Sequence, residues 1–206
     1  MLILLADAEL ELVPEQLWNE EDVIREAKSK GKEPSRMILD NHSMRNAIRR
    51  MFPGKEGRIG FPQIAYLFHI MNKETVLNGH IEVDYAIHTK HNVIIEKSDL
   101  IEGEGGYESF IEIIERMLWE RSKTATVMDY LDQKGIAGNT VVLHPQGRSG
   151  LLPTAQSNYV IGGFPQGDFV SDLGKMRRFS IYEEEITVPG VLELLHFRIF
   201  KQLSWP

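Results

Sequence analysis

The stretch NYVIGGFPQG, residues 158–167, combines a strand-forming run with a loop of nearly bare backbone. Tyr159, Val160 and Ile161 favour a strand, and the glycines that follow let a ligand approach the main chain closely. In α/β proteins, a buried strand that ends in such a loop often holds a small molecule. The same residues also fit a tight turn after a core strand. The stretch therefore predicts either a small-molecule site or a plain turn.

Asp40 and His42 supply a carboxylate and an imidazole directly after the short apolar run 37–39. Carboxylates and imidazoles are the usual groups for general acid–base catalysis. Asp40 also fits an Asx turn or the cap of a helix that begins at Ser43. His42 taken alone fits a surface or structural histidine. Both interpretations of this pair stay open.

Arg45, Arg49 and Arg50 form a basic face on a helix expected over residues 43–51. They lie in the segment 25–58, which has ten Lys and Arg residues against four Asp and Glu residues, although the whole chain has a net charge of −7. Residues 96–120 have two against eight. A phosphate-bearing partner would meet the first segment and be repelled by the second. A solvated helix face is the simpler alternative for the arginines.

Several kinds of chemistry find no support in the sequence. The chain has no cysteine, which excludes disulfides, thiolate nucleophiles and zinc sites that need sulfur. The histidines lack the spacing of a metal site, so no metal is expected. The glycine loop lacks the Lys-Ser/Thr pair of a phosphate-binding loop, and Ser149 does not stand in a nucleophile elbow. We expect Glu183, Glu184 and Glu185 to be a solvated charge run.

Strands and helices alternate at both ends of the chain, which predicts a parallel α/β sheet. Strands are expected at 2–5, 37–39, 140–143, 159–161 and 179–182, with a β-hairpin formed by 81–87 and 93–96. Helices are expected at 7–11 after an Asp7 cap, 15–28, 43–51, 61–71, 107–120, 124–134 and 188–200. The apolar start of the chain is too short to cross a membrane. We expect a cytoplasmic protein with no membrane contact.

Five segments in order resemble one known family: residues 8–14 (AELELVP), 38–42 (ILDNH), 85–96 (YAIHTKHNVIIE), 160–167 (VIGGFPQG) and 179–182 (FSIY). Their order and spacing are similar to the ribosome-biogenesis SPOUT methyltransferases, which methylate N1 of a pseudouridine in small-subunit rRNA. The resemblance implies an α/β knot with a parallel sheet and a β-hairpin insertion, in one domain over residues 1–206 with the insertion at 78–106. It also implies S-adenosylmethionine as cofactor and a homodimer.

The resemblance further implies that three loops form the cofactor site. The first follows the strand 141–143, the second is the glycine loop, and the third leads into the last helix. The residues expected to bind the cofactor are Leu143, His144, Gly162, Gly163, Phe164, Gly167, Ile181, Ile186, Thr187 and Val188. Apolar side chains in this set suit a flat adenine slot, and the glycines expose main-chain groups.

The chain differs from the family pattern at three places. The family's Arg-Pro-Asp motif is Phe61-Pro62-Gln63 here, so an arginine and a carboxylate are missing, and Arg58 is the nearest basic residue. A basic RNA-contact segment of the family is the acidic segment 102–106 here, EGEGG. The family's Tyr-Pro-Leu-Ser segment is EEIT at 184–187. The cofactor loops thus follow the family more closely than the substrate-facing residues do.

Methylation of N1 of pseudouridine requires removal of the N1 proton. Asp40 matches the family pattern and is expected to be the base or to position the target, with His42 as its partner. Arg45, Arg49, Arg50 and Arg58 are expected to bind small-subunit rRNA. One alternative is a knot protein that binds S-adenosylmethionine and has a different RNA target or a non-catalytic role in ribosome assembly. Another alternative, from a different class, is a flavodoxin-like protein that binds a nucleotide at the same glycines.

Overall fold

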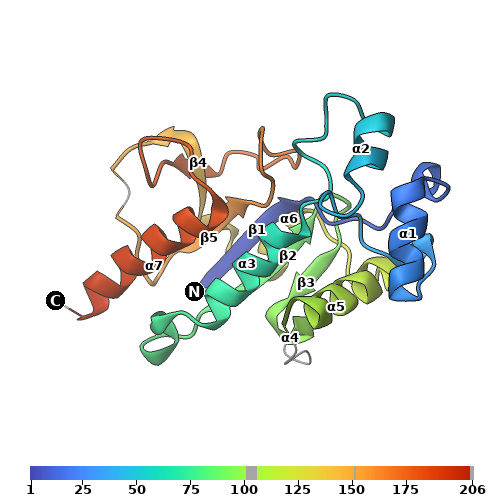
Figure 1. The fold of residues 1–206 in the computed structure, drawn as a ribbon. Coiled ribbons are helices and arrows are strands. Elements are labelled where there is room, and N and C mark those ends of the chain that lie inside the picture. Colours follow the sequence, from blue (N-terminus) through green and yellow to red (C-terminus); the bar gives the residue numbers. More distant parts are fainter. Residues whose placement is uncertain (101–105, 151, 205–206) are drawn as a thin grey trace.

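The computed structural model describes residues 1–100, 106–150 and 152–204, which form a mostly parallel sheet with helices on both faces (Figure 1). The strands are Leu2–Ala8 (β1), Asp84–Thr89 (β2), Ile94–Glu96 (β3), Thr140–Arg148 (β4), Asn158–Gly162 (β5) and Arg177–Phe179 (β6). Their order in the sheet is β3-β2-β1-β5-β4-β6. Only the pairing of β2 with β3 is antiparallel, which is the expected hairpin.

The helices cover the two faces of the sheet unequally. They are Glu21–Lys30 (α1), Arg45–Met51 (α2), Pro62–Lys73 (α3), Lys97–Leu100 (α4), Gly106–Glu120 (α5), Val127–Gln133 (α6) and Val188–Ser204 (α7). Side chains alternate along β1, so Ile3 and Leu5 face the core beneath α3, α5 and α7. Leu2 and Leu4 face the smaller core beneath α6. Both faces are apolar because helices cover a parallel sheet on both sides.

The helices α1 and α2 lie together at one end of the molecule (Figure 1), and a separate apolar cluster joins them. Its centre includes Leu17, Val23 and Ile48, all fully buried. This small core holds the basic segment beside the sheet rather than on it. The chain then returns to the sheet through residues 52–61 and enters α3, where Pro62 occupies the first turn as expected.

The helix expected after an Asp7 cap is wrong, because β1 continues through Asp7 to Ala8. Asp7 has a positive φ of 55°, and the pairing register with β2 shifts between Leu5 and Ala8. Its side chain is buried and accepts hydrogen bonds from the chain near Ser171. Long-range bonds, which a local pattern cannot reveal, thus replace the expected cap.

Two further expectations in this region are wrong. Residues 37–39 form no strand of the sheet, since only an isolated bridge joins Ile38 to Leu12. Ser43 does not cap the next helix; α2 begins at Arg45 and the carboxylate of Asp22 accepts from the backbone N–H groups of Asn46 and Ala47, both at 3.0 Å. The cap therefore comes from α1 rather than from the residue just before α2.

The remaining elements agree with expectation within a few residues. The helix expected at 15–28 is a short 3-10 turn, Glu15–Leu17, followed by α1. The helix expected from 124 begins at Val127, where the Thr126 side chain caps it. β4 is longer than expected because it pairs with β6. The strand expected at 179–182 is wrong except for Phe179, because β6 begins at Arg177 and ends at Phe179. The acidic segment 102–106 lies, except for Gly106, outside the described residues. No helix in the described ranges is long and apolar enough to cross a membrane.

Candidate functional site

A large cavity lies at the carboxyl ends of β4 and β5, where an open parallel sheet usually binds its ligand. Its volume is about 1120 Å³. Its walls come from the end of β4, the loop after β5, the segment between β6 and α7, and the start of α3. They include Leu143, Gly162, Ile181 and Ile64. Single small-ligand sites usually span about 300–1,000 Å³, so this cavity has room for more than one small group.

The cavity brings together nearly all the residues expected to bind a cofactor. The lining contains Leu143, His144, Gly162, Phe164, Gly167, Ile181, Ile186, Thr187 and Val188. Leu143, Ile181 and Val188 also belong to the main core, so their side chains form an apolar wall fixed by packing. The three predicted loops thus meet around one hollow, although they are separated in sequence.

Gly163 is the exception among these residues, because it packs against β1 and not into the cavity lining. A Cβ atom at Gly163 would lie 2.7 Å from the Cα of Ala8. Its N–H donates to the carbonyl of Ala6 at 2.6 Å, and its carbonyl accepts from Glu9. The close approach that requires a glycine here is therefore to a neighbouring strand. A larger residue at Gly163 would disturb the fold before it could report on a ligand.

His144 joins the first loop to the second loop of the cavity. Its Nδ1 accepts from the Gln146 N–H at 3.1 Å, so Nε2 carries the ring proton and donates to the Asp168 carboxylate at 3.1 Å. Burial alone would raise the pKa of Asp168, but the N–H of Phe169 and the His144 ring lower it overall. Both imidazole nitrogens make hydrogen bonds, so His144 fixes the geometry of the two loops.

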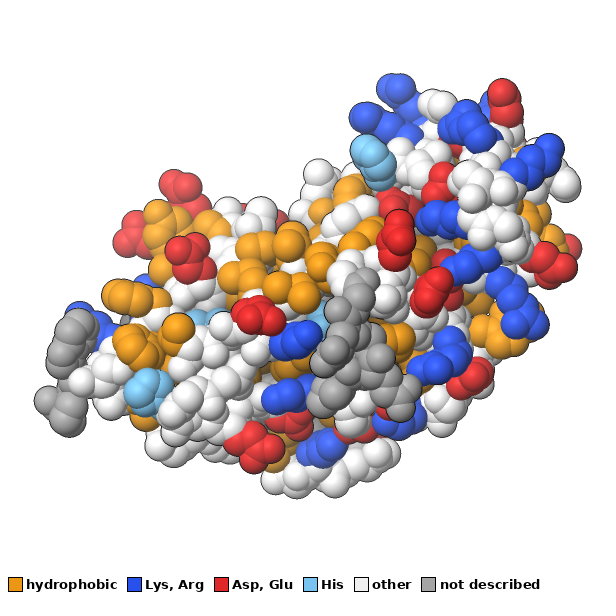
Figure 2. Space-filling model, turned by 60° about the horizontal axis from the view of Figure 1, so that its bottom comes forward, with side chains coloured by type: hydrophobic (Ala, Val, Ile, Leu, Met, Phe, Trp, Pro, Cys, Tyr) orange, Lys and Arg blue, Asp and Glu red, His pale blue; other side chains and the backbone are white. Residues whose placement is uncertain are grey.

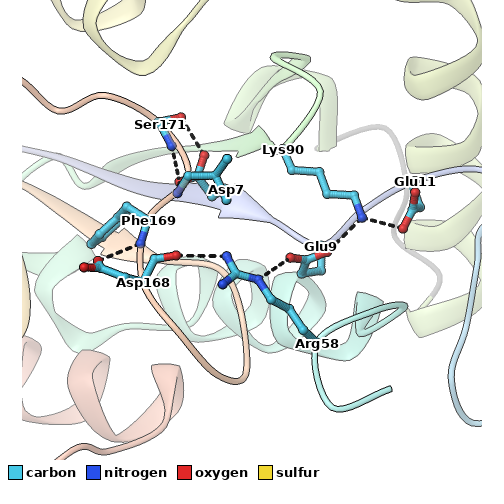
Figure 3. A network of polar contacts seen from close by, with 9 residues as sticks. Asp7, Glu9, Glu11, Arg58, Lys90, Asp168, Phe169 and Ser171 are labelled. Carbon is cyan, nitrogen blue, oxygen red and sulfur yellow. Dashed lines mark hydrogen bonds and ion pairs between the residues drawn. The ribbon is translucent and has the colours of Figure 1, made fainter. Parts of the chain in front are cut away.

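Arg58 connects the loop 52–61 to the glycine loop (Figure 3). Its Nη2 donates to the Asp168 carbonyl at 2.9 Å, its Nε donates to Glu9 at 3.0 Å, and its guanidinium lies 4.7 Å from the centre of the Phe164 ring. Gly167 has a φ of 92°, and a Cβ there would meet the guanidinium at 2.4 Å. Arg58 was expected to bind RNA, but its contacts here are to the cofactor-side loop.

Lys90 continues this network from Glu9 to Glu11 (Figure 3). The side chain of Glu9 is only 4% exposed, yet it contacts two cations, Arg58 and Lys90. Burial would raise the pKa of Glu11, but His91 and Lys90 lower it overall. Charges buried in this way persist only when they are paired. The network therefore ties the turn of the hairpin to the loops at the cavity.

Asp7 fixes the next part of the same loop from the end of β1. Its carboxylate accepts from Val170 N–H at 2.7 Å and from the Ser171 hydroxyl at 2.6 Å. The Asp7 N–H donates to Nδ1 of His88 at 3.3 Å. Burial lowers the pKa of His88, so its ring is neutral at neutral pH and can accept that bond. Asp168 and Ser171 are thus held by different partners on the two sides of the loop.

Asp40 and His42 lie close to each other but do not line the cavity. Oδ1 of Asp40 accepts from the His42 main-chain N–H at 2.8 Å, which is the Asx turn considered from the sequence, and from Nε2 of Gln63 at 3.0 Å. Gln63 stands where the family has a carboxylate, so an amide donor now faces Asp40. Burial, then the nearby Asp40 carboxylate, raises the pKa of Tyr107, which therefore stays protonated.

The basic residues Arg45, Arg49 and Arg50 are exposed on α2. Arg49 and Arg50 line a second cavity of about 470 Å³ between α1 and α2. Arg50 is paired with Glu20 at 2.5 Å. The described residues contain no group of three or more Asp, Glu or His side chains placed to hold a metal ion.

The sequence did not single out several residues that line the main cavity. They include Ile64, Leu67, Asp168 and Phe169. The side chains of α3 could be placed in the core by their pattern, but which of them face the hollow depends on how α3 packs against α7. Asp168 directly follows Gly167, and this position beside the glycine loop was the one sequence feature that could have marked it as a site residue. Glu184 and Glu185 are exposed as expected and also form part of the rim.

The fold and the cavity define a class: an α/β protein with a mostly parallel sheet that holds a small ligand in loops at the strand ends. The chain is similar to the crystal structure of Archaeoglobus fulgidus Nep1 bound to S-adenosylhomocysteine, with a TM-score of 0.77, 20% identity and coverage of 98% of this chain and 97% of that one. This similarity shows that the fold is the SPOUT α/β knot with a β-hairpin.

Sequence comparison gives the family. Residues 3–196 match the EMG1/NEP1 methyltransferase family. The chain is 32% identical to the "Ribosomal RNA small subunit methyltransferase Nep1" of Thermoplasma acidophilum and 31% identical to that of Thermoplasma volcanium, each over 92% of both chains. The chain belongs to the EMG1/NEP1 methyltransferase family. A flavodoxin-like nucleotide-binding protein is thereby set aside.

Proposed function

We propose that the protein transfers a methyl group from S-adenosylmethionine to N1 of a pseudouridine in small-subunit rRNA. The observation that carries this proposal is the cavity at the ends of β4 and β5, where three separate loops converge as the family resemblance implied. The named relatives are small-subunit rRNA methyltransferases, and a solved relative with the same fold holds S-adenosylhomocysteine. Ribosome assembly in the cytoplasm is the corresponding setting.

The residues of the cavity fit such a cofactor. An apolar wall of Leu143, Ile181 and Val188 offers a flat surface for adenine, while the backbone around Gly162 supplies donors and acceptors. The exposed carboxylates of Glu184 and Glu185 at the rim favour a ligand that carries positive charge. When bound, S-adenosylmethionine supplies an electrophilic methyl group on a sulfonium. The remaining volume leaves room for the target base beside it.

The N1 proton of the target must leave as the new N–C bond forms. We assign its removal to the Asp40 carboxylate, with His42 next to it, as the sequence resemblance implied. Gln63 donates to Oδ1 of Asp40 and so ties this carboxylate to the first turn of α3, in which Ile64 lines the cavity. The N1–H bond would break as the proton passes to this carboxylate, and the methyl group would leave the sulfonium for N1, with S-adenosylhomocysteine as the second product.

A homodimer would complete the site. Leu67 and Tyr182 line the cavity yet are 44% and 47% exposed, and Phe197 on α7 is 59% exposed. Figure 2 shows hydrophobic side chains gathered over the face that α3 and α7 form. Apolar patches of this kind mark interaction surfaces. A second copy packed on this face would close the cavity from the outside, and the single domain would then act as half of a dimer.

A second candidate function keeps the cofactor and changes the chemistry. Gln63 cannot ionise, and it replaces the carboxylate that the family carries at this position. A protein of this kind would bind S-adenosylmethionine and rRNA during ribosome assembly without methyl transfer, or would act on another RNA. The presence of Asp40 next to Gln63 favours the catalytic function, because a carboxylate remains at this place.

Calorimetric titration with S-adenosylhomocysteine tests the cofactor site. The wild-type protein should bind, and Ile186→Trp should weaken binding at least about tenfold, since the indole would fill the cavity that Ile186 lines. Met51→Trp serves as the matched control, because Met51 is 40% exposed and lies outside this cavity. Absence of binding by the wild-type protein would contradict both candidate functions.

A further inference from the structure

The cleft between α1 and α2 is a second polar cavity, separate from the cofactor site. It is lined by Glu21, Asp22, Arg25, Asn46, Arg49 and Arg50, with a volume of about 470 Å³. Arg25 was not among the residues expected to bind RNA. Arg25 adds a third guanidinium to this cavity. From the sequence we expected only a basic helix face here, without a cavity.

The guanidinium groups of this cleft differ in how they are engaged. Arg50 is paired with Glu20 at 2.5 Å. Arg25 and Arg49 are exposed and make no ion pair or side-chain hydrogen bond within residues 1–100, 106–150 and 152–204. Two unpaired arginines that face one hollow suit an anion, because each fork of N–H donors can contact two phosphate oxygens.

The walls of the cleft are held in place by Asp22. Its side chain is 2% exposed, and Oδ2 accepts from the N–H groups of Asn46 and Ala47, both at 3.0 Å. This carboxylate therefore locks the start of α2 onto α1. The apolar cluster around Val23 and Ile48 packs beneath the same pair of helices. A cleft with fixed walls loses little conformational entropy when a ligand binds.

The three arginines of this cleft belong to the segment that has the excess of positive charge. Segment 25–58 has ten Lys and Arg residues against four Asp and Glu residues, whereas the rest of the chain has 13 against 26. Figure 2 shows Lys and Arg side chains gathered toward the end of the molecule that α1 and α2 form. An acidic protein that binds RNA must make its phosphate contacts where its positive charge lies.

The chain that leads out of α2 links the cleft to the cofactor cavity. A Cβ at Gly57 would meet the Gln166 side chain at 2.9 Å, and Arg58 donates to the Asp168 carbonyl. Phe61, a few residues further, lines the cavity itself. An RNA strand whose target base enters the cavity can therefore follow residues 52–61 toward α2.

We propose that the α1–α2 cleft binds a phosphodiester of the substrate RNA through Arg25 and Arg49. This inference rests on the proposed function and deepens it. Arg25 and Arg49 position the strand, Asn46 adds an amide donor at the same wall, and Glu21 opposes binding by its charge. The contact is to the backbone and is independent of the base.

The test measures binding of a labelled small-subunit rRNA fragment that contains pseudouridine, by fluorescence anisotropy over a range of salt concentrations. Arg25→Gln with Arg49→Gln should weaken binding about tenfold and reduce the slope of log K against log salt by about 1.4, the value for two single-strand phosphate contacts. Glu21→Gln should strengthen binding. Lys28→Gln with Lys55→Gln is the charge-matched control, because both lysines lie in the basic segment but outside the cleft.

The outcomes separate this site from the proposed function. S-adenosylhomocysteine binding should be the same in all variants, which shows that the fold is intact. If the wild-type protein methylates the RNA and both double variants weaken binding equally, general electrostatic attraction explains the data and the cleft is not a site. If the wild-type protein neither binds nor methylates the RNA, the proposed function fails together with the cleft.

Discussion

At the scale of single residues, Arg58 shows how one side chain can join the two halves of a site. It comes from the loop after α2 and donates to the carbonyl of Asp168 and to the carboxylate of Glu9. The stacked Phe164 ring and the close approach of Gly167 leave little room for another arrangement. The family's arginine is absent at Phe61, and Arg58 now supplies a guanidinium beside the cofactor cavity.

We predict that Arg58→Ala weakens S-adenosylhomocysteine binding about tenfold, equivalent to about 1.4 kcal/mol, because the glycine loop loses its anchor. Arg58→Lys should restore part of the affinity, since an ammonium can still contact Glu9 but cannot contact both partners. Calorimetry measures the affinity for S-adenosylhomocysteine, and fluorescence anisotropy measures the affinity for the rRNA fragment. If Arg58→Ala lowers RNA affinity and leaves cofactor affinity unchanged, Arg58 binds RNA as the sequence suggested.

The residues that could be predicted from sequence were those whose signal is local. Glycines after an apolar run indicated a loop at a strand end, whereas Leu143 and Ile181 were placed beside that loop by the family resemblance. Asp168, Arg58 and Asp7 act through hydrogen bonds to residues far away in the chain. No pattern in the neighbouring sequence could therefore predict these contacts. Position 163 requires a glycine, as expected, but the reason is the close approach of Ala8 and not the approach of a ligand.

At the scale of elements, α2 is too short to be stable by itself and depends on α1. Asp22 caps it across the cleft. Sequence placed the cap at Ser43 because an N-cap is usually the residue that just precedes the helix. Tertiary contact supplied it here instead.

Asp22→Ala should lower the free energy of unfolding by about 1–2 kcal/mol, because two N–H groups at the start of α2 lose their acceptor. Asp22→Asn keeps one acceptor oxygen and should lose less. Urea unfolding followed by circular dichroism measures both variants. Equal stability of Asp22→Ala and the wild-type protein would show that water replaces the cap without cost.

The edge strand β3 is held by a second charged cluster. Glu96 contacts Lys134 at 2.7 Å and Lys123 at 3.0 Å, and the Tyr130 hydroxyl donates to it at 3.1 Å. The Lys134 hydrogen bond lowers the pKa of Glu96 to about 2, despite the opposing effect of burial. A lowered carboxylate pKa stabilises the folded state above the unfolded pKa near 4.5, and the stabilisation is lost as pH falls toward 2.

Glu96→Gln should therefore lower the free energy of unfolding by about 1 kcal/mol at pH 7. The difference from the wild-type protein should shrink as pH falls from about 4.5 toward 2. Urea unfolding of both proteins at several pH values measures this. A difference that stays constant over this range would mean that the charge of Glu96 does not contribute.

At the scale of the whole molecule, the sheet, its hairpin and its flanking helices followed from periodicity and turn residues. The order of the strands did not, because β5 lies between β1 and β4 although it follows β4 in the chain. Family resemblance supplied the knotted parallel sheet but not the order of its strands, because no local pattern encodes that order. The meeting of the three cofactor loops is a consequence of the same strand order.

The exposed apolar face on α3 and α7 predicts association in solution. Phe197→Glu should shift the protein from dimer toward monomer, because a charge would be buried in the contact. Met51→Glu, at an exposed apolar residue on α2, should leave the mass unchanged. Sedimentation equilibrium measures both variants. If the wild-type protein is monomeric at all concentrations, the proposal that a second copy closes the cavity is wrong.

Methyl transfer to defined RNA is the decisive test of whether the protein is a pseudouridine N1-methyltransferase. A small-subunit rRNA fragment with pseudouridine at a single position and its uridine counterpart are incubated with the protein and S-adenosylmethionine. Products are identified by mass spectrometry of nucleosides. We expect N1-methylpseudouridine from the first RNA, none from the second, and at least about a hundredfold slower transfer by Asp40→Asn, which cannot accept the proton. Binding of cofactor and RNA by the wild-type protein without any methylated nucleoside would contradict this function.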